Sequence, residues 1–291
     1  MSQGRLKNPP AGYSLHLTGI VLILLIGFMP PGFCEAAGKI AVAVSIPPQA
    51  YFVERIGGSV VQVQVMIPNY ADHDTYEPTP KQLVALANAR IYFKIGTPGF
   101  PFETRYIDPA IKKNGNLKAV NMSEGITLLD TDPHIWMAPY TVRAAAVNIY
   151  NALAAIDPPR RNDYRKNLES FLVDIDRLDH GIRNILNGKR GYSFLILHPS
   201  LGYFAAQYGL IQISIESEGK SPSALRMREI VDTAKKKGIR IILVQKGFDQ
   251  KSARAVAGEI GARTREIDPL AKNWLGNMMY IAETVGKALK P

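Results

Sequence analysis

Short apolar runs alternate with amphipathic stretches along most of the chain after Lys39. The apolar runs are rich in valine and isoleucine and have the length of buried strands, about four to seven residues. The predicted strands are Ile40–Val44, Val61–Ile67, Ile91–Ile95, Leu117–Val120, Phe194–Leu197, Ile211–Ile215, Ile239–Val244 and Thr264–Ile267. The predicted helices are Ala50–Ile56, Pro80–Asn88, Val142–Ala155, Leu201–Tyr208, Ser223–Lys237, Ser252–Ile260 and Asn273–Leu289. Strands separated by helices indicate βαβ units, so the sequence predicts an α/β fold with mainly parallel sheets.

One segment breaks this alternation and predicts a single long helix from Pro158 to Leu186. Asp157 is a good helix cap, and Asn187-Gly188 ends the pattern. The apolar residues, spaced alternately by four and three positions, are Tyr164, Leu168, Phe171, Ile175, Leu178, Ile182 and Ile185. This spacing keeps a single stripe facing a partner. Roughly 29 residues would reach about 43 Å, which suits a strut between two lobes better than the alternative, an ordinary crossover helix on one sheet.

The pattern therefore predicts two (β/α) lobes, residues 37–156 and residues 189–291, joined by a rigid linker helix over residues 157–188. Ligands of open α/β sheets bind beyond the carboxyl ends of the strands. Two lobes that face each other would bring two such edges together. We therefore expect a binding cleft between the lobes.

The N-terminal residues have the pattern of a secretory signal peptide. Basic residues precede Leu17–Phe28, an apolar run that is too short to span a bilayer comfortably. Small residues at Cys34 and Ala36 predict cleavage after Ala36. Residues 1–36 would then be removed, and the mature protein would be periplasmic.

Cys34 is the only cysteine, and it allows a rival prediction, a lipoprotein acylated at this residue. The bulky Phe33 stands where a small residue is expected, which favours the cleaved form; an uncleaved anchor is a third alternative. After cleavage no cysteine remains, which excludes disulfides, thiolate metal sites and a cysteine nucleophile. No second apolar stretch reaches membrane-spanning length, so we expect no stable membrane insertion of the mature protein.

The chain carries a formal net charge of +10, but the basic residues are scattered among acidic ones. A nucleic-acid-binding protein would show a basic stripe or a recognisable motif, and neither is present. We therefore expect a solvated basic surface and no nucleic-acid partner. We also expect a monomer.

Three histidines lie in loops near the ends of predicted strands. His198 directly follows the strand Phe194–Leu197. His134 lies in the stretch DTDPHIWMAP, and His73 lies in NYADHDTYEPTP. Asp268 directly follows the last predicted strand. A single histidine in such a place is usually structural, but imidazoles and a carboxylate that converge are the ligands that zinc, manganese and iron accept.

From Lys39 to the C-terminus the chain resembles the metal-binding solute-receptor family of zinc and manganese ABC importers. The stretches that carry the resemblance are IPNYADHDTYEPTPKQL, YFKIGTPGF, DPHIWMAP, HPSLGYFAAQYGL, VQKGFDQKSARAVAGEIGA and IDPLAKNWLGNMMYIAE. Each is weak alone, but together and in order they are highly specific. The resemblance implies two (β/α) lobes joined by a long rigid helix, one metal ion in the cleft, and delivery of that ion to a membrane permease.

The resemblance also implies metal ligands, one position at a time. His134 matches the histidine of the family's DPHxW loop, and Asp268 matches the aspartate of its DPL turn. His198 matches the third ligand position, where a histidine is usual for zinc receptors and a glutamate is common in manganese receptors. The ligand set therefore favours Zn²⁺ over Mn²⁺ or Fe²⁺.

The first ligand is where the sequence departs from the family pattern, Asp-Pro-His-Thr-Tyr-Glu-Pro. An ungapped match places His73 on the proline and Asp74 on the histidine. Either Asp74 takes the ligand role, or the loop shifts by one residue and His73 does. With Asp74 the charges of the ligands would neutralise a divalent ion, whereas with His73 the bound site would keep a charge of about +1.

Three further acidic residues are candidates for a supporting role in the cleft. Glu77 could support the first ligand or cap the helix after Pro78. Asp132 could orient His134 or cap a turn. Glu216 could line the cleft or belong to a solvated loop.

These observations predict a binding protein and no enzyme. The main expectation is a periplasmic receptor that captures zinc for an ABC importer; a manganese, iron or metal-chelate receptor of the same family is the alternative. A zinc-dependent hydrolase would need a general base beside the metal. Only Glu77 or Glu218 could be argued for that role.

Overall fold

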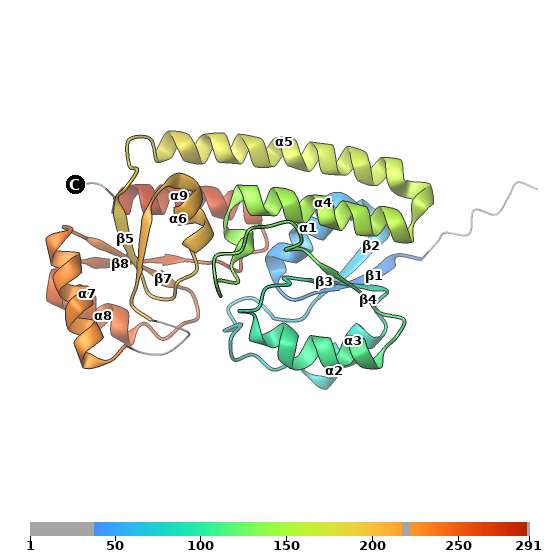
Figure 1. The fold of residues 1–291 in the computed structure, drawn as a ribbon, viewed down its shortest axis with the longest axis horizontal. Coiled ribbons are helices and arrows are strands. Elements are labelled where there is room, and N and C mark those ends of the chain that lie inside the picture. Colours follow the sequence, from blue (N-terminus) through green and yellow to red (C-terminus); the bar gives the residue numbers. More distant parts are fainter. Residues whose placement is uncertain (1–37, 217–221, 290–291) are drawn as a thin grey trace, which may run out of the picture. The chain divides into compact units, whose positions relative to one another are not determined.

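The computed structural model describes residues 38–216 and 222–289. The predicted signal peptide with Cys34, and also Glu218, lie outside the described residues. All the elements described below belong to one unit, Gly38–Pro291. Figure 1 shows this unit as two parallel sheets that lie beneath one long helix.

The first sheet has the strand order β2-β1-β3-β4, and all of its strands run parallel. Its strands are β1 (Ile40–Val44), β2 (Val61–Val65), β3 (Ile91–Lys94) and β4 (Lys118–Asn121). Its helices are α1 (Pro47–Gly57), α2 (Pro80–Ala87), α3 (Asp108–Lys113) and α4 (Pro139–Ile156). β1 and β3 lie in the middle and are almost fully buried, as their continuous apolar sequences require. β2 alternates buried or half-buried residues with exposed ones, as an edge strand does.

The second sheet repeats this topology with the order β6-β5-β7-β8, again all parallel. Its strands are β5 (Ser193–Ile196), β6 (Ile211–Ser214), β7 (Ile241–Gln245) and β8 (Arg263–Ile267). Its helices are α6 (Gly202–Tyr208), α7 (Ala224–Lys236), α8 (Lys251–Ile260) and α9 (Trp274–Ala288). The predicted α/β fold with two parallel-sheet lobes is therefore confirmed.

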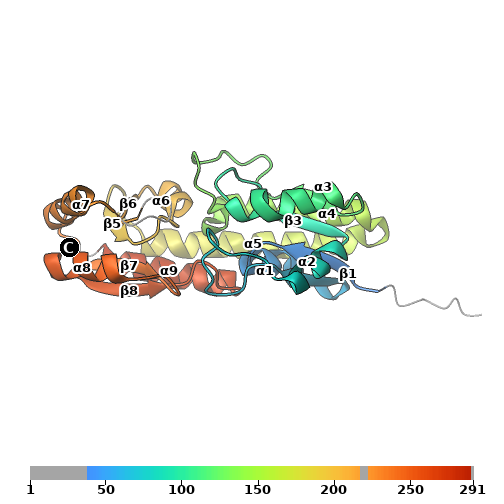
Figure 2. The same ribbon diagram turned by 90° about the horizontal axis from the view of Figure 1, so that it is seen from below.

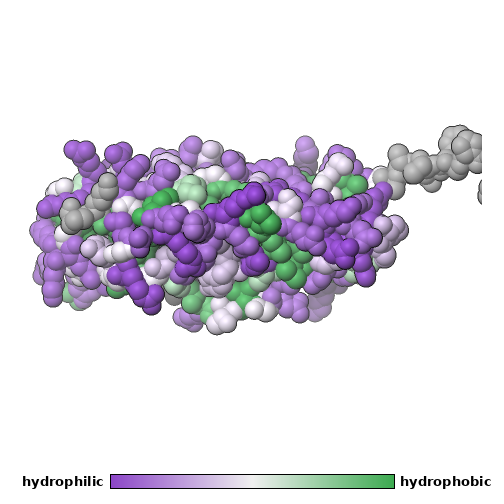
Figure 3. Space-filling model, turned by 90° about the horizontal axis from the view of Figure 1, so that it is seen from above, coloured by the Kyte–Doolittle hydropathy of each residue, from purple (hydrophilic) through white to green (hydrophobic). Residues whose placement is uncertain are grey.

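The long helix α5 (Arg161–Ile185) has 25 residues, which corresponds to about 37 Å. It packs against α1 and α4 of the first lobe and against α9 of the second, and Figure 2 shows it lying behind both lobes. Its buried residues, Tyr164, Leu168, Phe171, Ile175, Leu178 and Ile182, belong to the stripe that the sequence predicts. Figure 3 views the chain from the α5 side, where the surface is mainly hydrophilic with narrow apolar strips. The helix is therefore amphipathic and serves as a strut.

The start of the strut differs in detail from the prediction. A 3₁₀ turn over Pro158–Arg160 precedes α5, so the α-helix begins at Arg161. The carboxylate of Asp157 makes no capping bond and instead accepts hydrogen bonds from the Tyr164 hydroxyl and from Arg160 (3.0 Å). Asp157 thereby ties the end of α4 to the first turns of α5.

Buried apolar side chains from both lobes and from the strut form one continuous core. Trp274 of α9 packs edge-on against Phe52 of α1, with ring centroids 5.2 Å apart. The indole N–H of Trp274 donates to the carbonyl of Trp136 (2.6 Å), and the indole N–H of Trp136 donates to the carbonyl of Pro269 (2.9 Å). A second core is confined to the layer of α7 and α8 on the second sheet. The two lobes are thus joined by buried packing as well as by the strut.

The sequence analysis missed one helical segment, the π-helical turn Glu103–Ile107 and α3 that connect β3 to β4. Prolines at positions 101 and 109 obscure its periodicity, since proline usually ends helices. No helix within residues 38–216 and 222–289 is both long and apolar enough to cross a membrane.

Candidate metal centre

His73 lies in the loop that leads from the edge strand β2 to α2. Asp72 shapes this loop, because its side chain accepts hydrogen bonds from the backbone N–H of Asp74 (3.0 Å) and from the Thr75 hydroxyl (3.2 Å). The ring of His73 is buried, with only 4% of the residue exposed, and stands edge-on to Phe100 at 5.5 Å. The loop therefore turns His73 inward, toward the other histidines.

His134 follows the other edge strand, β4, and its ring is held by a carboxylate. Asp132 Oδ1 accepts hydrogen bonds from the backbone N–H of His134 (2.9 Å) and from ring Nδ1 (2.7 Å). One carboxylate therefore plays both roles that the sequence left open, the turn cap and the orienting partner. A proton on Nδ1 leaves the lone pair of Nε2 free for a metal ion.

His198 follows the central strand β5 and is held by its backbone. The side chain of Gln245, at the end of β7, accepts from the His198 N–H (3.2 Å) and donates to the His198 carbonyl (2.6 Å) and to Ser200 Oγ (2.9 Å). The sequence analysis missed Gln245. Its only signal was a polar residue at the end of the apolar run IILV, at the carboxyl edge where ligands gather.

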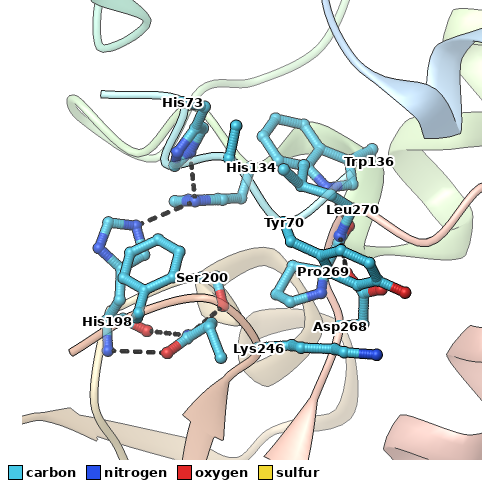
Figure 4. Close-up of a pocket in the computed structure, with 13 residues that line it drawn as sticks. Tyr70, His73, His134, Trp136, His198, Ser200, Lys246, Asp268, Pro269 and Leu270 are labelled. Carbon is cyan, nitrogen blue, oxygen red and sulfur yellow. Dashed lines mark hydrogen bonds between the residues drawn. The ribbon is translucent and has the colours of Figure 1, made fainter. Parts of the chain in front are cut away.

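The three rings converge on one point (Figure 4). His134 Nε2 lies 3.2 Å from His73 Nε2 and 3.4 Å from His198 Nε2. The three histidines offer nitrogens that all lie within 4.8 Å of one another. Two nitrogens bound to one tetrahedral zinc ion at about 2.0–2.1 Å are about 3.3–3.4 Å apart. The spacing of the nitrogens thus fits a shared zinc ion.

The histidine rings are in an environment that keeps them neutral. Burial lowers the pKa of His134, against the opposing effect of Asp132. Burial, with the neighbouring His134 and His73, lowers the pKa of His198 to about 2. Neutral imidazole is the form that coordinates metals. Nδ1 of His73 and Nδ1 of His198 are buried and have no hydrogen-bond partner.

His73, His134 and His198 form a histidine triad. The cavity beside this triad is small, ≈ 20 Å³, and is lined from both lobes. That volume is about what one water molecule or one ion occupies. Besides the histidines its walls include Asp268, Phe248, Lys246 and Tyr70. The Lys246 ammonium lies 4.2 Å from the centre of the Tyr70 ring, so this pair links the two lobes at the wall of the cavity. Sequence analysis identified only Asp268 among these four.

Asp268 and Asp74 lie outside the triad. Asp268 lines the same cavity, but its Oδ1 accepts the backbone N–H of Leu270 (3.0 Å) and it is not part of the cluster of nitrogens. Burial raises the pKa of Asp268. Asp74 lies on the opposite side of the His73 ring, with Oδ1 3.9 Å from Nδ1. Of the two first-ligand candidates, His73 is the one that the structure brings to His134 and His198.

The remaining acidic candidates lie farther out. Glu77 is exposed and lines neither of the two cavities beside the triad. It does not cap the following helix, because Thr79 does so by accepting the Gln82 N–H (3.3 Å). Glu216 is half-buried; burial raises its pKa, and the charges of Asp72, Asp249 and Asp74 raise it further. Glu216 lines neither of the two cavities beside the three histidines.

Comparison with known proteins places the chain in a family. A family model described as the periplasmic component A of the zinc-uptake complex matches residues 42–288. One curated relative is the high-affinity zinc uptake system protein ZnuA of Bacillus subtilis, 26% identical over 267 residues that cover 82% of this chain and 81% of the relative.

Solved structures are similar over nearly the same range. A crystal structure of ZnuA is 39% identical with a TM-score of 0.83, and the match covers 87% of this chain and 100% of that one. A ZnuA deletion mutant with zinc bound is 39% identical with a TM-score of 0.82, covering 87% and 99%. The resemblance predicted from the ordered sequence motifs is confirmed by these matches.

Proposed function

The chain belongs to the family of periplasmic zinc-uptake components, and from that premise we propose that it captures Zn²⁺ between its two lobes and delivers it to the permease of an ABC importer. The single observation that carries this proposal is the spacing of the histidine Nε2 atoms, 3.2 Å and 3.4 Å from the shared His134. The ion is cargo, so the site must bind it and later release it.

His73, His134 and His198 are the proposed ligands that hold the ion. The burial of His73 and its 3.2 Å approach to His134 support it as the first ligand in place of Asp74. We infer that Asp268 supplies the fourth ligand, because it lines the same small cavity from the second lobe. Three neutral imidazoles and one carboxylate favour zinc over manganese or iron, which prefer sites richer in oxygen.

The inner cavity has the size of a site for a single ion. Its volume of ≈ 20 Å³ beside the three histidines is about that of one ion or one water molecule. Glu77, one of the two residues that could have been argued as a general base, is exposed and away from the cavity. The proposal is therefore reversible binding without turnover.

The proposed setting follows from the family and the N-terminal pattern. The family is periplasmic by description, and we propose that residues 1–36 direct export and are removed. The mature protein would then act as a monomer that docks on a membrane permease.

Metal titration of the purified, demetallated protein tests the proposal. We expect one tightly bound Zn²⁺ per chain by calorimetry and native mass spectrometry, with Mn²⁺ and Fe²⁺ displaced in competition. Ester, peptide and phosphate substrates should not turn over. Failure to bind Zn²⁺, or tighter binding of Mn²⁺ or Fe²⁺, would overturn the zinc assignment.

A further inference from the structure

The His73 ring has a second face that the triad does not use. Its Nδ1 lies 3.8 Å from Asp72 Oδ1 and 3.9 Å from Asp74 Oδ1. These distances are too long for hydrogen bonds, and Nδ1 is a buried atom without a hydrogen-bond partner. His73 itself is only 4% exposed. An unpartnered ring nitrogen thus points at two carboxylates.

The three groups have the spacing of a metal site. One ligand atom from each of Asp72, His73 and Asp74 lies within 4.8 Å of the other two. Both aspartate side chains are partly exposed, at 37% and 25%, so they can be reached from solvent. They line an outer cavity of ≈ 1050 Å³ that also reaches His134 and His198. The carboxylates of the cluster therefore share this outer cavity with two histidines of the triad, while His73 itself does not line it.

The surroundings of this cluster are acidic although the whole chain has a formal net charge of +10. Asp130 and Asp132 line the same outer cavity. Glu216 of the second lobe lies close enough to Asp72 and Asp74 for their charges to raise its pKa, after the larger effect of burial. Negative charge concentrated at a cleft attracts cations and speeds their arrival.

We propose that Asp72, Asp74 and Nδ1 of His73 form a second, outer site that captures a partly hydrated divalent transition-metal ion before the ion passes to the histidine triad. This inference rests on the proposed function, since it supplies the entry step of the same receptor. Two carboxylates balance the charge of the ion, and the oxygen-rich set discriminates less among metals than three imidazoles do. The outer site is thus a collecting site, and the triad sets the selectivity.

The chemistry of one imidazole ring makes the two sites alternate. A neutral imidazole has one N–H and one lone pair. With the lone pair on Nδ1, His73 binds the outer ion; with the lone pair on Nε2, it binds the inner ion. When the ion moves inward, Nε2 loses its proton to water and Nδ1 gains one from water, so the net proton count is unchanged.

The two aspartates keep a role after the transfer. Nδ1 then carries a proton, and this N–H faces the carboxylates of Asp72 and Asp74. A carboxylate on the far side of a metal-bound imidazole raises the basicity of the ligand. Occupation of the triad therefore closes the outer site, and the loaded receptor holds one ion.

Removal of the triad isolates the outer site for a direct test. In His134→Ala/His198→Ala, titration with Co²⁺ followed by visible absorption should show one weak site on His73. Adding Asp72→Asn/Asp74→Asn should weaken this site by at least about tenfold. The asparagine oxygen at position 72 can still accept the backbone N–H of residue 74, so the loop geometry is kept. An affinity for Co²⁺ that is the same with and without the two aspartates would overturn the proposal.

The intact receptor provides the second measurement, which does not depend on folding of the histidine variant. In stopped-flow mixing with Zn²⁺ at low ionic strength, Asp72→Asn/Asp74→Asn should slow association by at least about tenfold, whereas Asp130→Asn should change it by less than about twofold. Asp130 is the matched control because it lines the same outer cavity but is not part of the cluster. The double variant removes two charges and Asp130→Asn removes one, so equal slowing per removed charge, about threefold or more for Asp130→Asn, would indicate a general field and overturn the outer site.

The two proposals fail in different ways. A wild-type protein that binds no Zn²⁺ contradicts the receptor function itself. A wild-type protein that binds one Zn²⁺ tightly, with association unchanged in Asp72→Asn/Asp74→Asn, contradicts the outer site alone.

Discussion

The two lobes have the same strand order but supply their histidines in different ways. In the first lobe, His73 and His134 lie in loops that follow the edge strands β2 and β4. In the second lobe, His198 lies two residues after the central strand β5, at the point where the strand order reverses. In doubly wound sheets that point is the usual ligand site.

The equivalent point of the first lobe is filled by a side chain of the protein. Glu103 accepts the backbone N–H groups of Ile95 (2.6 Å) and Gly96 (3.0 Å) after β3, and the hydroxyl of Ser45 after β1. The carboxylate thus takes the place that a ligand would occupy. The first lobe must therefore reach the cleft with longer loops from its edges.

The means of holding the rings differ accordingly. His134 is fixed through its ring by Asp132, whereas His198 is fixed through its backbone by Gln245 and its Nδ1 has no partner. His134 is therefore held in a fixed orientation by a hydrogen bond to its ring, whereas neither His73 of the first lobe nor His198 of the second has such a bond at Nδ1. One ring of fixed orientation beside two rings without such a bond suits a site that must both bind and release.

The largest loss of zinc affinity should come from removing the ring of His134, which lies next to both other histidines. We expect His134→Ala to weaken zinc binding by more than about 100-fold, since loss of a supporting partner alone costs about 10- to 100-fold. Competition with a chromogenic chelator measures the change. Affinity within tenfold of wild type would show that His134 is not a ligand.

Loss of the carboxylate behind that ring should have the next largest effect. Asp132→Ala is expected to reduce zinc affinity by about 10- to 100-fold, because the ring loses its orienting acceptor. Asp132→Asn retains an oxygen that accepts the same hydrogen bonds and should lose less. If both variants bind zinc with wild-type affinity, Asp132 does not orient His134 for binding.

The lobes should also respond to pH in opposite directions. Burial raises the pKa of Glu103 to about 7, so its contribution to stability is complete below pH 4.5 and is lost as the pH rises toward 7. Burial lowers the pKa of His198 to about 2, so the folded protein loses stability as the pH falls below 6.5.

Glu103→Gln should separate these two responses in the metal-free protein. Without the titration of Glu103, the free energy of unfolding should rise between pH 5 and pH 6.5 more steeply than in wild type, by up to about 1.4 kcal/mol per pH unit. Urea unfolding at several pH values measures this slope. Identical slopes in the two proteins would mean that Glu103 is ionised in the fold at all of these pH values.

The smallest effect should come from the exposed ion pair that joins the lobes. Lys272 Nζ lies 2.8 Å from Glu54 Oε1, and both side chains are about half exposed, at 50% and 41%. Lys272→Ala should lower the free energy of unfolding by less than about 1 kcal/mol and leave zinc affinity unchanged. A larger loss would assign the pair a part in holding the lobes together.

The sequence could predict what depends on local periodicity and on position along the chain. Strand and helix patterns identify the two lobes and α5. The positions of His134 and His198 in loops after predicted strands indicate that they lie close together. The choice between His73 and Asp74 could not be made, because a shift of one residue in a loop changes no pattern. Gln245 and Glu103 were missed because each side chain joins the ends of two different strands, β5 and β7 for Gln245 and β1 and β3 for Glu103, and only the packed sheet brings these ends together.

The strut and the shared core have a mechanical consequence for release of the ion. Lobes that share buried tryptophans cannot swing widely apart without exposing apolar surface to water, so the frame is stiff. Metal–ligand distances in such sites vary by only about 0.2 Å. A relative displacement of the lobes well below the diameter of the ion would therefore be enough to loosen it.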